Sequence, residues 1–293
     1  MALGGFLCPF CRYYNANDAT VCSRCERRLP PSQVAGAVSS VLSIDLWATK
    51  LLAGISILVF ALQIASAGGK LQIGLTGMPL STLIRFGSMT NGLQGAEPFR
   101  LLASCFVHMG ILHVAMNMMA LANLGRLIEP EIKGPRLVLA YVFTGIVGFA
   151  ATVWWYGDKP YVTAGASGAI FGLEGLIVGS LAAKRDPRWK DMMKQIAFSS
   201  VLLAVALPVN NAAHAGGFVA GLLLGAVLHK EARPWHLASV VNVAAALSLL
   251  AVGVSLVLAQ RSPVWRQYKV MEDRFHDRQS EERRIRQDEV IEP

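Results

Sequence analysis

The chain has 293 residues, of which 54% are hydrophobic and only 16% are charged, with a formal net charge of +8. A soluble domain carries about 25% charged residues, and here the deficit is concentrated in long uncharged runs, so the composition excludes an ordinary soluble protein and predicts several membrane spans. Because much of the positive charge lies in short loops between apolar runs, it indicates membrane orientation, and we expect no nucleic-acid partner.

Residues 1–30 form a small polar module with two C-x-x-C pairs, Cys8 with Cys11 and Cys22 with Cys25. Four thiolates at this spacing can bind one tetrahedral zinc ion. Two disulfides or redox-active thiols are the alternatives. So short a segment needs a metal or covalent staple to hold its fold, and we expect zinc. Its role should be structural, because four cysteine ligands leave no open coordination position for catalysis.

After a linker over residues 31–45, apolar runs predict an all-α membrane bundle with seven spans. These spans cover residues 51–67, 111–124, 137–156, 167–183, 196–209, 214–228 and 237–259. The first six form a core over residues 46–230, and the seventh is an additional helix within residues 235–259. We interpret the weakly charged stretch 68–100 as a loop that is partly embedded at the membrane interface. Residues 260–293 carry eight basic and eight acidic residues, which predicts a solvated or partly helical tail without catalytic residues.

Basic residues occur in alternate loops of this predicted bundle. They lie between spans two and three (Arg126, Lys133, Arg136), four and five (Lys184, Arg185, Arg188, Lys190, Lys194), and six and seven (Lys230, Arg233). Such loops face the cytoplasm. We therefore expect a multi-pass protein of the cell (inner) membrane with its N-terminus and cysteine module in the cytoplasm, where thiols stay reduced and zinc is favoured over disulfides.

Two reactive side chains open two of the predicted spans. Ser167 begins the fourth span and His214 the sixth. A serine needs a base to become a nucleophile, and histidine is the usual one. Seventeen helical residues from Ser167 rise roughly 25 Å, less than the hydrocarbon core of about 30 Å, so Ser167 should lie a few ångströms below the outer boundary. Polar groups at that depth need partners or water. One shared, hydrated cavity would supply these to both Ser167 and His214.

Small residues indicate how these two spans approach each other. Gly217, Gly221 and Gly225 recur every four residues along the sixth span, and further glycines thin the fourth. This spacing is typical of close helix packing in membranes. It favours contact between the two spans, although the glycines taken alone are better explained by helix packing without chemistry.

A third polar pair lies in the second span. His113 and Asn117 are four residues apart and share a helix face. Their N–H groups, with the Ser167 backbone N–H, can donate to a developing oxyanion. The alternative is a buried interhelical hydrogen bond.

Together these motifs resemble the rhomboid family of intramembrane serine proteases. The matching segments are Gly165-Ala166-Ser167-Gly168, His113-x-x-x-Asn117 and Ala213-His214-x-x-Gly217-x-x-x-Gly221, and the resemblance covers about residues 46–230. It implies a Ser–His dyad with Ser167 as nucleophile and His214 as general base, His113 and Asn117 as oxyanion donors, and transmembrane segments of membrane proteins as substrates.

Two further positions fit the resemblance. Glu97-Pro98-Phe99-Arg100 is similar to the first-loop signature of the family, with Phe99 where tryptophan is usual. Phe171, one turn after Ser167, is expected to stack beneath His214.

Two other functions stay open. One is a catalytically inactive rhomboid-like protein that binds and retains client membrane helices, against which the intact Ser167 and His214 argue. The other is a small-solute transporter, for which Glu174 in the middle of the fourth span is the best support, since a charge there is costly and has to face inward or be neutral. Glu174 lies roughly 10 Å along the helix from Ser167, too far to serve as the acid of a triad.

Overall fold

The computed structural model describes residues 5–8, 13–16, 19–29, 46–69, 74–75, 77–93, 95–206, 209–228 and 236–291. It divides the chain into two compact units, Met1–Trp47 and Ala48–Pro293. The predicted linker 31–45 and Cys11 lie outside the described residues.

The first unit is built on a short hairpin. Strand β1 (Gly5–Leu7) pairs antiparallel with β2 (Tyr14–Ala16), and an isolated bridge joins Val21 to Arg28. Buried Cys8, Cys22 and Leu29 form its small core. A unit with so little apolar area ordinarily needs a metal or a covalent link for stability.

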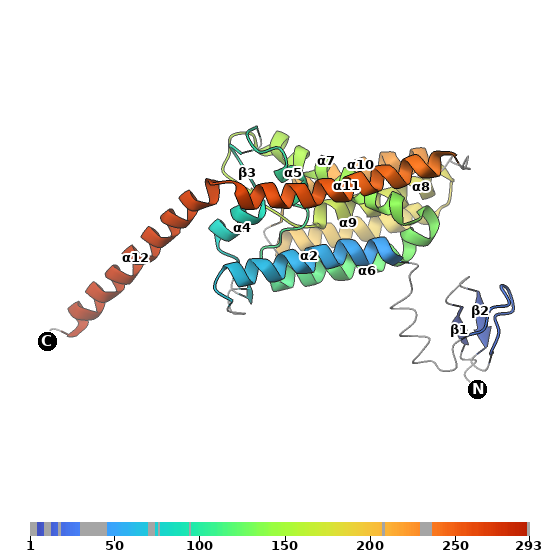
Figure 1. Ribbon diagram of the computed structural model, residues 1–293, viewed down its shortest axis with the longest axis horizontal. Coiled ribbons are helices and arrows are strands. Elements are labelled where there is room, and N and C mark those ends of the chain that lie inside the picture. Colours follow the sequence, from blue (N-terminus) through green and yellow to red (C-terminus); the bar gives the residue numbers. More distant parts are fainter. Residues whose placement is uncertain are drawn as a thin grey trace. The chain divides into compact units, whose positions relative to one another are not determined.

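The second unit is a helical bundle (Figure 1). Its long helices are α2 (Trp47–Ser66), α6 (Ile111–Ile132), α7 (Gly134–Tyr156), α8 (Ser167–Ala183), α9 (Arg188–Ala206), α10 (Asn211–Leu228), α11 (His236–Arg261) and α12 (Val264–Ile291). Two short helices, α4 (Leu80–Phe86) and α5 (Arg100–Ala103), lie between α2 and α6. Strands β3 (Met89–Thr90) and β4 (Val162–Thr163) pair antiparallel.

Five of the described helices are long and apolar enough to cross a membrane: α2, α6, α7, α10 and residues 240–261 of α11. Helix α8 is apolar but has only 17 residues. Helix α9 begins eight residues before the predicted span, and its first two turns carry Arg188, Lys190, Asp191 and Lys194, which shortens its apolar part. The chain is therefore a multi-pass integral membrane protein. The use of α11 as an additional seventh span stays a prediction.

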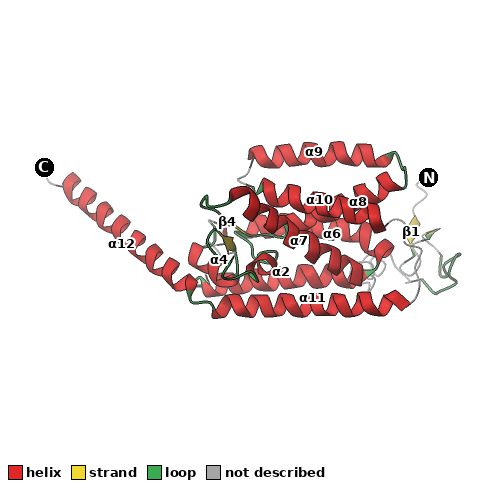
Figure 2. Ribbon diagram, turned by 90° about the horizontal axis from the view of Figure 1, so that it is seen from above, coloured by secondary structure: helices red, strands yellow, loops and turns green. Residues whose placement is uncertain are grey.

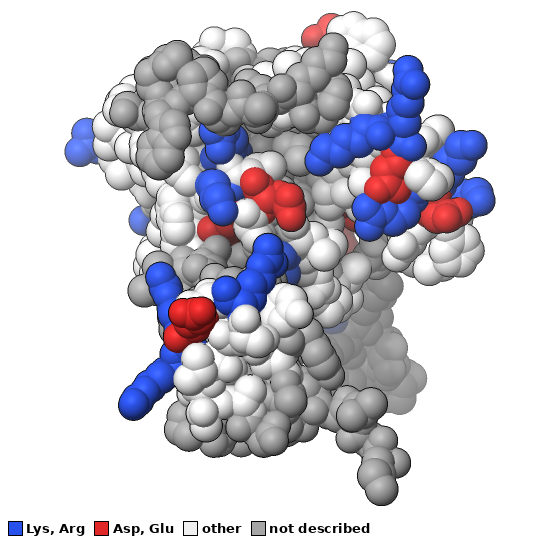
Figure 3. Space-filling model, turned by 90° about the vertical axis from the view of Figure 1, so that its right-hand side faces the viewer, with Lys and Arg blue, Asp and Glu red and all other residues white. Residues whose placement is uncertain are grey.

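The bundle places α8 and α10 between other helices. Figure 2 shows α9 on one side and α11 on the opposite side, with α7, α8 and α10 between them. Helix α10 packs on both α8 and α7. In the second unit, the turn from α6 to α7 contains Lys133, and the turn from α8 to α9 contains Lys184 and Arg185. Basic residues of these loops are the feature on which the predicted orientation rests. Figure 3 shows one face of the molecule with its basic side chains in blue and its acidic side chains in red.

The contact between α8 and α10 is made by backbone. A Cβ added to Gly221 of α10 would collide with the carbonyl oxygen of Gly172 in α8, and one at Gly217 would collide with that of Gly168. On α8, Gly175 faces the Phe218 carbonyl in the same way. The predicted glycine contact between these helices is thus present, and it fixes their relative height because each turn meets a turn of its neighbour.

The first loop, which is the connection between α2 and α6 and includes the stretch 68–100 that was expected to be partly embedded, is packed within the second unit. Leu83, Ile84 and Phe86 of α4 are buried, and Phe106 and Val107 after α5 are fully buried. The charged tail beyond residue 260 is helical over Val264–Ile291, and its first turns contact α4. The tail is therefore attached to the first loop and is not wholly solvated.

Candidate active site

Ser167 and His214 are in direct contact. Ser167 is the first residue of α8, and His214 lies one turn into α10. The His214 Nε2 atom is 2.9 Å from the Ser167 Oγ atom, a normal distance for a hydrogen bond. The glycine contact described above brings together the first turns of the two helices, and so the two side chains.

The His214 ring is held from beneath by Phe171. The centroids of the two rings are 4.3 Å apart and their planes are 17° from parallel, so the rings stack as predicted. Phe171 lies one turn after Ser167 on the same helix, so a single helix carries both the hydroxyl and the platform for the base.

Asn210 is a site residue that the sequence reasoning missed. Its Oδ1 atom accepts a hydrogen bond from the Ala213 N–H, which caps the start of α10. Its amide donates to Thr152 of α7 and Thr163 of β4, both at 2.9 Å. The cap thereby fixes the turn that carries His214 against two other elements. Asparagine immediately before an apolar run is a recognised helix-start signal that would have identified it.

His113 and Asn117 meet at the glycine that precedes the serine by two residues. A Cβ at Gly165 would lie 2.7 Å from His113 Nε2 and 3.8 Å from Asn117 Nδ2. The His113 Nδ1 atom accepts a hydrogen bond from the Met109 N–H, so a neutral ring carries its proton on Nε2. Asn117 donates one amide N–H to the His113 carbonyl and has a second. Both side chains therefore have an N–H donor near Gly165, two residues before Ser167.

All four predicted residues, Ser167, His214, His113 and Asn117, line one cavity of about 600 Å³. Apolar side chains from several elements form much of the remaining wall: Leu112, Met116, Phe149, Leu203 and Val209. Tyr161, in the loop before β4, also lines it, and burial raises the pKa of its phenol. The volume is that of a small-ligand site.

Glu174 lies apart from this site. It is two turns further along α8, and it is not among the cavity-lining residues. Its Oε2 atom is buried, and within the described part of the chain it has no hydrogen-bond partner. The residue faces inward, as expected for a carboxyl group in a membrane helix.

In the first unit, three of the four predicted metal ligands converge. The Sγ atoms of Cys8, Cys22 and Cys25 all lie within 4.8 Å of one another. The Cys8 and Cys25 sulfurs are 3.7 Å apart, which is too long for a disulfide bond of about 2.05 Å. Two thiolates that share a tetrahedral zinc at Zn–S distances of about 2.3 Å lie ~3.8 Å apart, so the residues fit such an ion.

The Cys22 sulfur also receives hydrogen bonds. The Arg24 backbone N–H and the Asn15 amide approach it at 3.4 and 3.6 Å. Donors of this kind stabilise a thiolate that binds a metal. The same Asn15 accepts from the Ser23 backbone N–H through Oδ1, so it ties the second cysteine pair to strand β2.

These features define a helical membrane protein with a serine–histidine pair on the wall of a cavity. Comparison with known proteins identifies the family. The family model described as "Rhomboid domain" matches residues 95–231. "RHOMBOID-like protein 5" of Arabidopsis thaliana is 34% identical over 160 residues, which cover 53% of this chain and 52% of that protein. "Rhomboid protease GluP" of Bacillus subtilis (strain 168) is 32% identical over 157 residues, which cover 50% of this chain and 29% of that protein.

YdcA, a rhomboid relative from the same bacterium, is 31% identical over 150 residues, which cover 48% of this chain and 74% of YdcA. The chain therefore belongs to the rhomboid family, as the sequence motifs predicted. It spans about half of the Arabidopsis relative and less than a third of GluP. The cysteine module and helices α2, α4, α11 and α12 lie outside the matched residues.

Proposed function

We propose that this protein is an intramembrane serine protease that cleaves transmembrane segments of membrane proteins through a Ser167–His214 dyad. The observation that carries the proposal is the 2.9 Å contact between Ser167 Oγ and His214 Nε2 on the wall of the cavity. Family membership supports it, since two bacterial relatives carry the words rhomboid protease in their names.

The dyad would work by nucleophilic catalysis. Ser167 Oγ attacks the carbonyl carbon of the scissile peptide bond while its proton passes to His214 Nε2. The C–N bond then breaks, and the leaving amine takes that proton from His214. In the second half, His214 removes a proton from water, which attacks the acyl-enzyme ester; the carboxylic acid leaves and the Ser167 hydroxyl is restored.

The negative oxygen of each tetrahedral intermediate needs hydrogen-bond donors. The His113 Nε2–H, the second amide N–H of Asn117 and the Ser167 backbone N–H are the proposed donors. Their position beside Gly165 supports this role, since the absence of a side chain there leaves space for the oxygen. Loss of one such donor typically costs about 10²–10³-fold in rate.

The four cysteines Cys8, Cys11, Cys22 and Cys25 are proposed to hold a structural zinc ion on the cytoplasmic side. When bound, the ion would crosslink the two C-x-x-C turns of a unit that has almost no core. This role requires no contact with the dyad, so cleavage should not depend on it.

The test is cleavage of a panel of transmembrane substrates by the purified protein in lipid, with a fluorophosphonate probe as a direct reporter of the nucleophile. We expect labelling at Ser167 and a loss of cleavage of at least about a thousandfold in Ser167→Ala and His214→Ala. Ser180→Ala, thirteen residues further along α8, is the matched control and should behave as wild type.

The competing function is a client-binding rhomboid-like protein without activity. Capture of transmembrane helices by a protein that neither cleaves them nor reacts with the probe would favour it over the protease. Flux of a small solute in sealed vesicles, lost in Glu174→Gln, would favour a transporter.

A further inference from the structure

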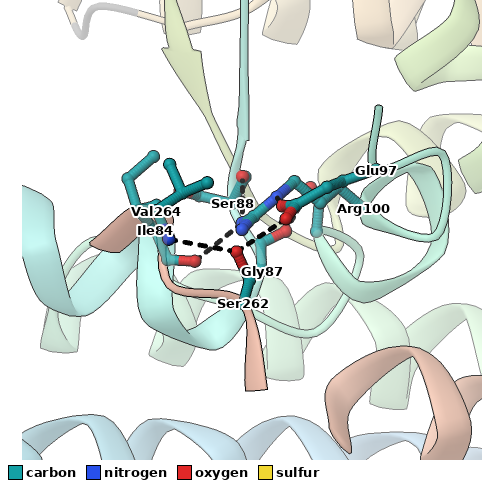
Figure 4. Close-up of polar contacts among 8 residues, drawn as sticks. Ile84, Gly87, Ser88, Glu97, Arg100, Ser262 and Val264 are labelled. Carbon is teal, nitrogen blue, oxygen red and sulfur yellow. Dashed lines mark hydrogen bonds and ion pairs between the residues drawn. The ribbon is translucent and has the colours of Figure 1, made fainter. Parts of the chain in front are cut away.

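A buried arginine organises the first loop. The Arg100 side chain is completely buried, and its Nε atom pairs with Glu97 Oε2 at 2.5 Å. Its Nη1 atom donates to the carbonyl oxygens of Ile84 and Ser88, at 2.6 and 3.2 Å (Figure 4). One guanidinium therefore ties the end of α4 to the start of α5, and its burial is tolerable because Glu97 neutralises it.

The second oxygen of Glu97 is bound by the C-terminal part of the chain. Ser262, in the turn between α11 and α12, donates from Oγ to Glu97 Oε1 at 2.6 Å and accepts from the Val264 N–H at 3.3 Å (Figure 4). Ser262 is buried, so the bond to the carboxylate is shielded from water and strong. It joins two residues 165 positions apart, one inside and one outside the matched rhomboid domain.

The same segment touches the first loop at further points. Arg85 of α4 donates from Nε to Gln260 Oε1 at 3.0 Å, and its guanidinium lies 4.9 Å from the centre of the Trp265 ring. Glu272 of α12 accepts from both the backbone N–H and the hydroxyl of Ser81. We name Gln260, Ser262, Trp265 and Glu272 the C-terminal clasp.

The clasped loop in turn contacts the residues that precede Ser167. The Ser104 N–H donates to the Arg100 carbonyl, and the Ser104 carbonyl accepts from the Gly165 N–H, both at 2.9 Å. The Ser104 hydroxyl donates to the Gly87 carbonyl at 2.9 Å. A second contact joins the first loop to this segment: β3, which belongs to the loop, pairs with β4, and β4 leads into Gly165.

A continuous series of hydrogen bonds thus runs from Ser262 through Glu97, Arg100 and Ser104 to Gly165. Gly165 has a φ of 134°, a conformation that only glycine adopts readily, and His113 and Asn117 converge on it. A displacement of its N–H by a fraction of an ångström would alter the geometry around Ser167. The glycine at the oxyanion donors is therefore fixed partly from outside the rhomboid domain.

We propose that the C-terminal clasp positions the Gly165–Ser167 segment for the reaction, with Ser262 as its central positioning residue. The inference rests on the proposed protease function. It assigns to α11 and α12 a part in catalytic efficiency that acts through the first loop without touching the substrate.

The experiment compares Ser262→Ala with Ser262→Thr, which keeps the hydroxyl, and with Ser255→Ala in the full-length protein. Ser255 is a matched control because it is equally buried on α11 but donates within its own helix, to the Val252 carbonyl. The measurements are kcat and KM for a transmembrane substrate, the rate of fluorophosphonate labelling of Ser167, and the thermal midpoint of each variant.

We expect Ser262→Ala to lower kcat and the labelling rate by roughly fivefold to tenfold with KM unchanged, as for loss of one charge-assisted hydrogen bond. Ser262→Thr should recover most of the rate, and Ser255→Ala should match wild type. Equal kcat in Ser262→Ala and Ser255→Ala, or a lowered thermal midpoint with normal kcat, would overturn the proposal.

A second site keeps the test decisive if Ser262→Ala does not fold. Glu272→Gln weakens the contact with Ser81, and we expect it to lower kcat by about twofold to threefold; Glu281→Gln, an exposed position further along α12, is its control. No difference between these two variants would count against the clasp. If wild-type protein is itself unlabelled by the probe, the protease proposal fails, which is a different result from equal labelling of wild type and Ser262→Ala.

Discussion

The Phe171 ring lies flat against the His214 imidazole, and the two residues come from the two helices that carry the candidate nucleophile and base. A histidine attached only through its Cβ can rotate about two bonds, whereas stacking restricts the plane of the ring. The stack therefore keeps Nε2 directed at the Ser167 hydroxyl.

We predict that Phe171→Ala slows probe labelling of Ser167 by roughly threefold to tenfold, the value of an aromatic pair of about 0.5–1.5 kcal/mol. Phe171→Tyr keeps the ring and should label at nearly the wild-type rate. Labelling kinetics in detergent with a fluorophosphonate measure both. An unchanged rate in Phe171→Ala would show that the histidine is oriented without the stack.

The glycine contact gives a prediction about stability. In Gly221→Ala the new methyl group meets the Gly172 carbonyl oxygen, and a backbone atom in the middle of a helix has little freedom to move aside. We expect the free energy of unfolding to fall by about 1–3 kcal/mol or more. Gly253→Ala on α11, where nothing lies within 4 Å of the new atom, is the control and should be neutral. Unfolding in mixed micelles, followed by circular dichroism, tests the pair.

Glu129 offers a separate test at the start of α2. Its carboxylate accepts from the backbone N–H groups of Ala48 and Thr49 at 3.0 and 2.9 Å, and from the Thr49 hydroxyl at 2.6 Å. Loss of this cap in Glu129→Ala should cost about 1–3 kcal/mol, because two buried N–H groups lose their acceptor. Glu131→Ala, exposed on the same helix, should leave the unfolding free energy within ~0.5 kcal/mol of wild type.

From the geometry of the cysteine unit, we predict that the purified protein contains one zinc ion per chain. Cys8→Ser should lose most of it, whereas Cys105→Ala, a buried cysteine in the second unit, should retain it; elemental analysis of purified protein measures the ratio. Chelation of the zinc should spare cleavage of a model substrate in detergent. A complete loss of cleavage on chelation would give the metal a role beyond the first unit.

Much of the site was predictable because it is encoded locally. Helix α8 begins at Ser167 as the apolar run indicated, since the positive φ of Gly165 is not helical and the helix can start only after it. The four-residue spacing of Gly217, Gly221 and Gly225 identifies the face of α10 that another helix can approach closely. The glycine-rich α8 is the helix that packs there. Two short motifs were therefore enough to predict that Ser167 and His214 meet.

Other features were not predictable because their partners are remote in sequence. Glu129 caps a helix 81 residues earlier, and Ser262 binds a carboxylate 165 residues earlier. No periodicity or spacing relates such pairs. Helix α9 extends beyond the predicted span for a different reason: its charged first turns interrupt the apolar pattern from which the span was predicted, although they continue the helix.

The backbone contact between α8 and α10 also limits how this protein could be redesigned. At Gly217 and Gly221 the two helices touch through backbone atoms. A side chain added at either position would collide with a carbonyl oxygen of α8, which has little freedom to move. If the proposed protease function holds, changes in selectivity are better sought at Leu112, Met116 and Leu203, which line the cavity with side chains of adjustable size.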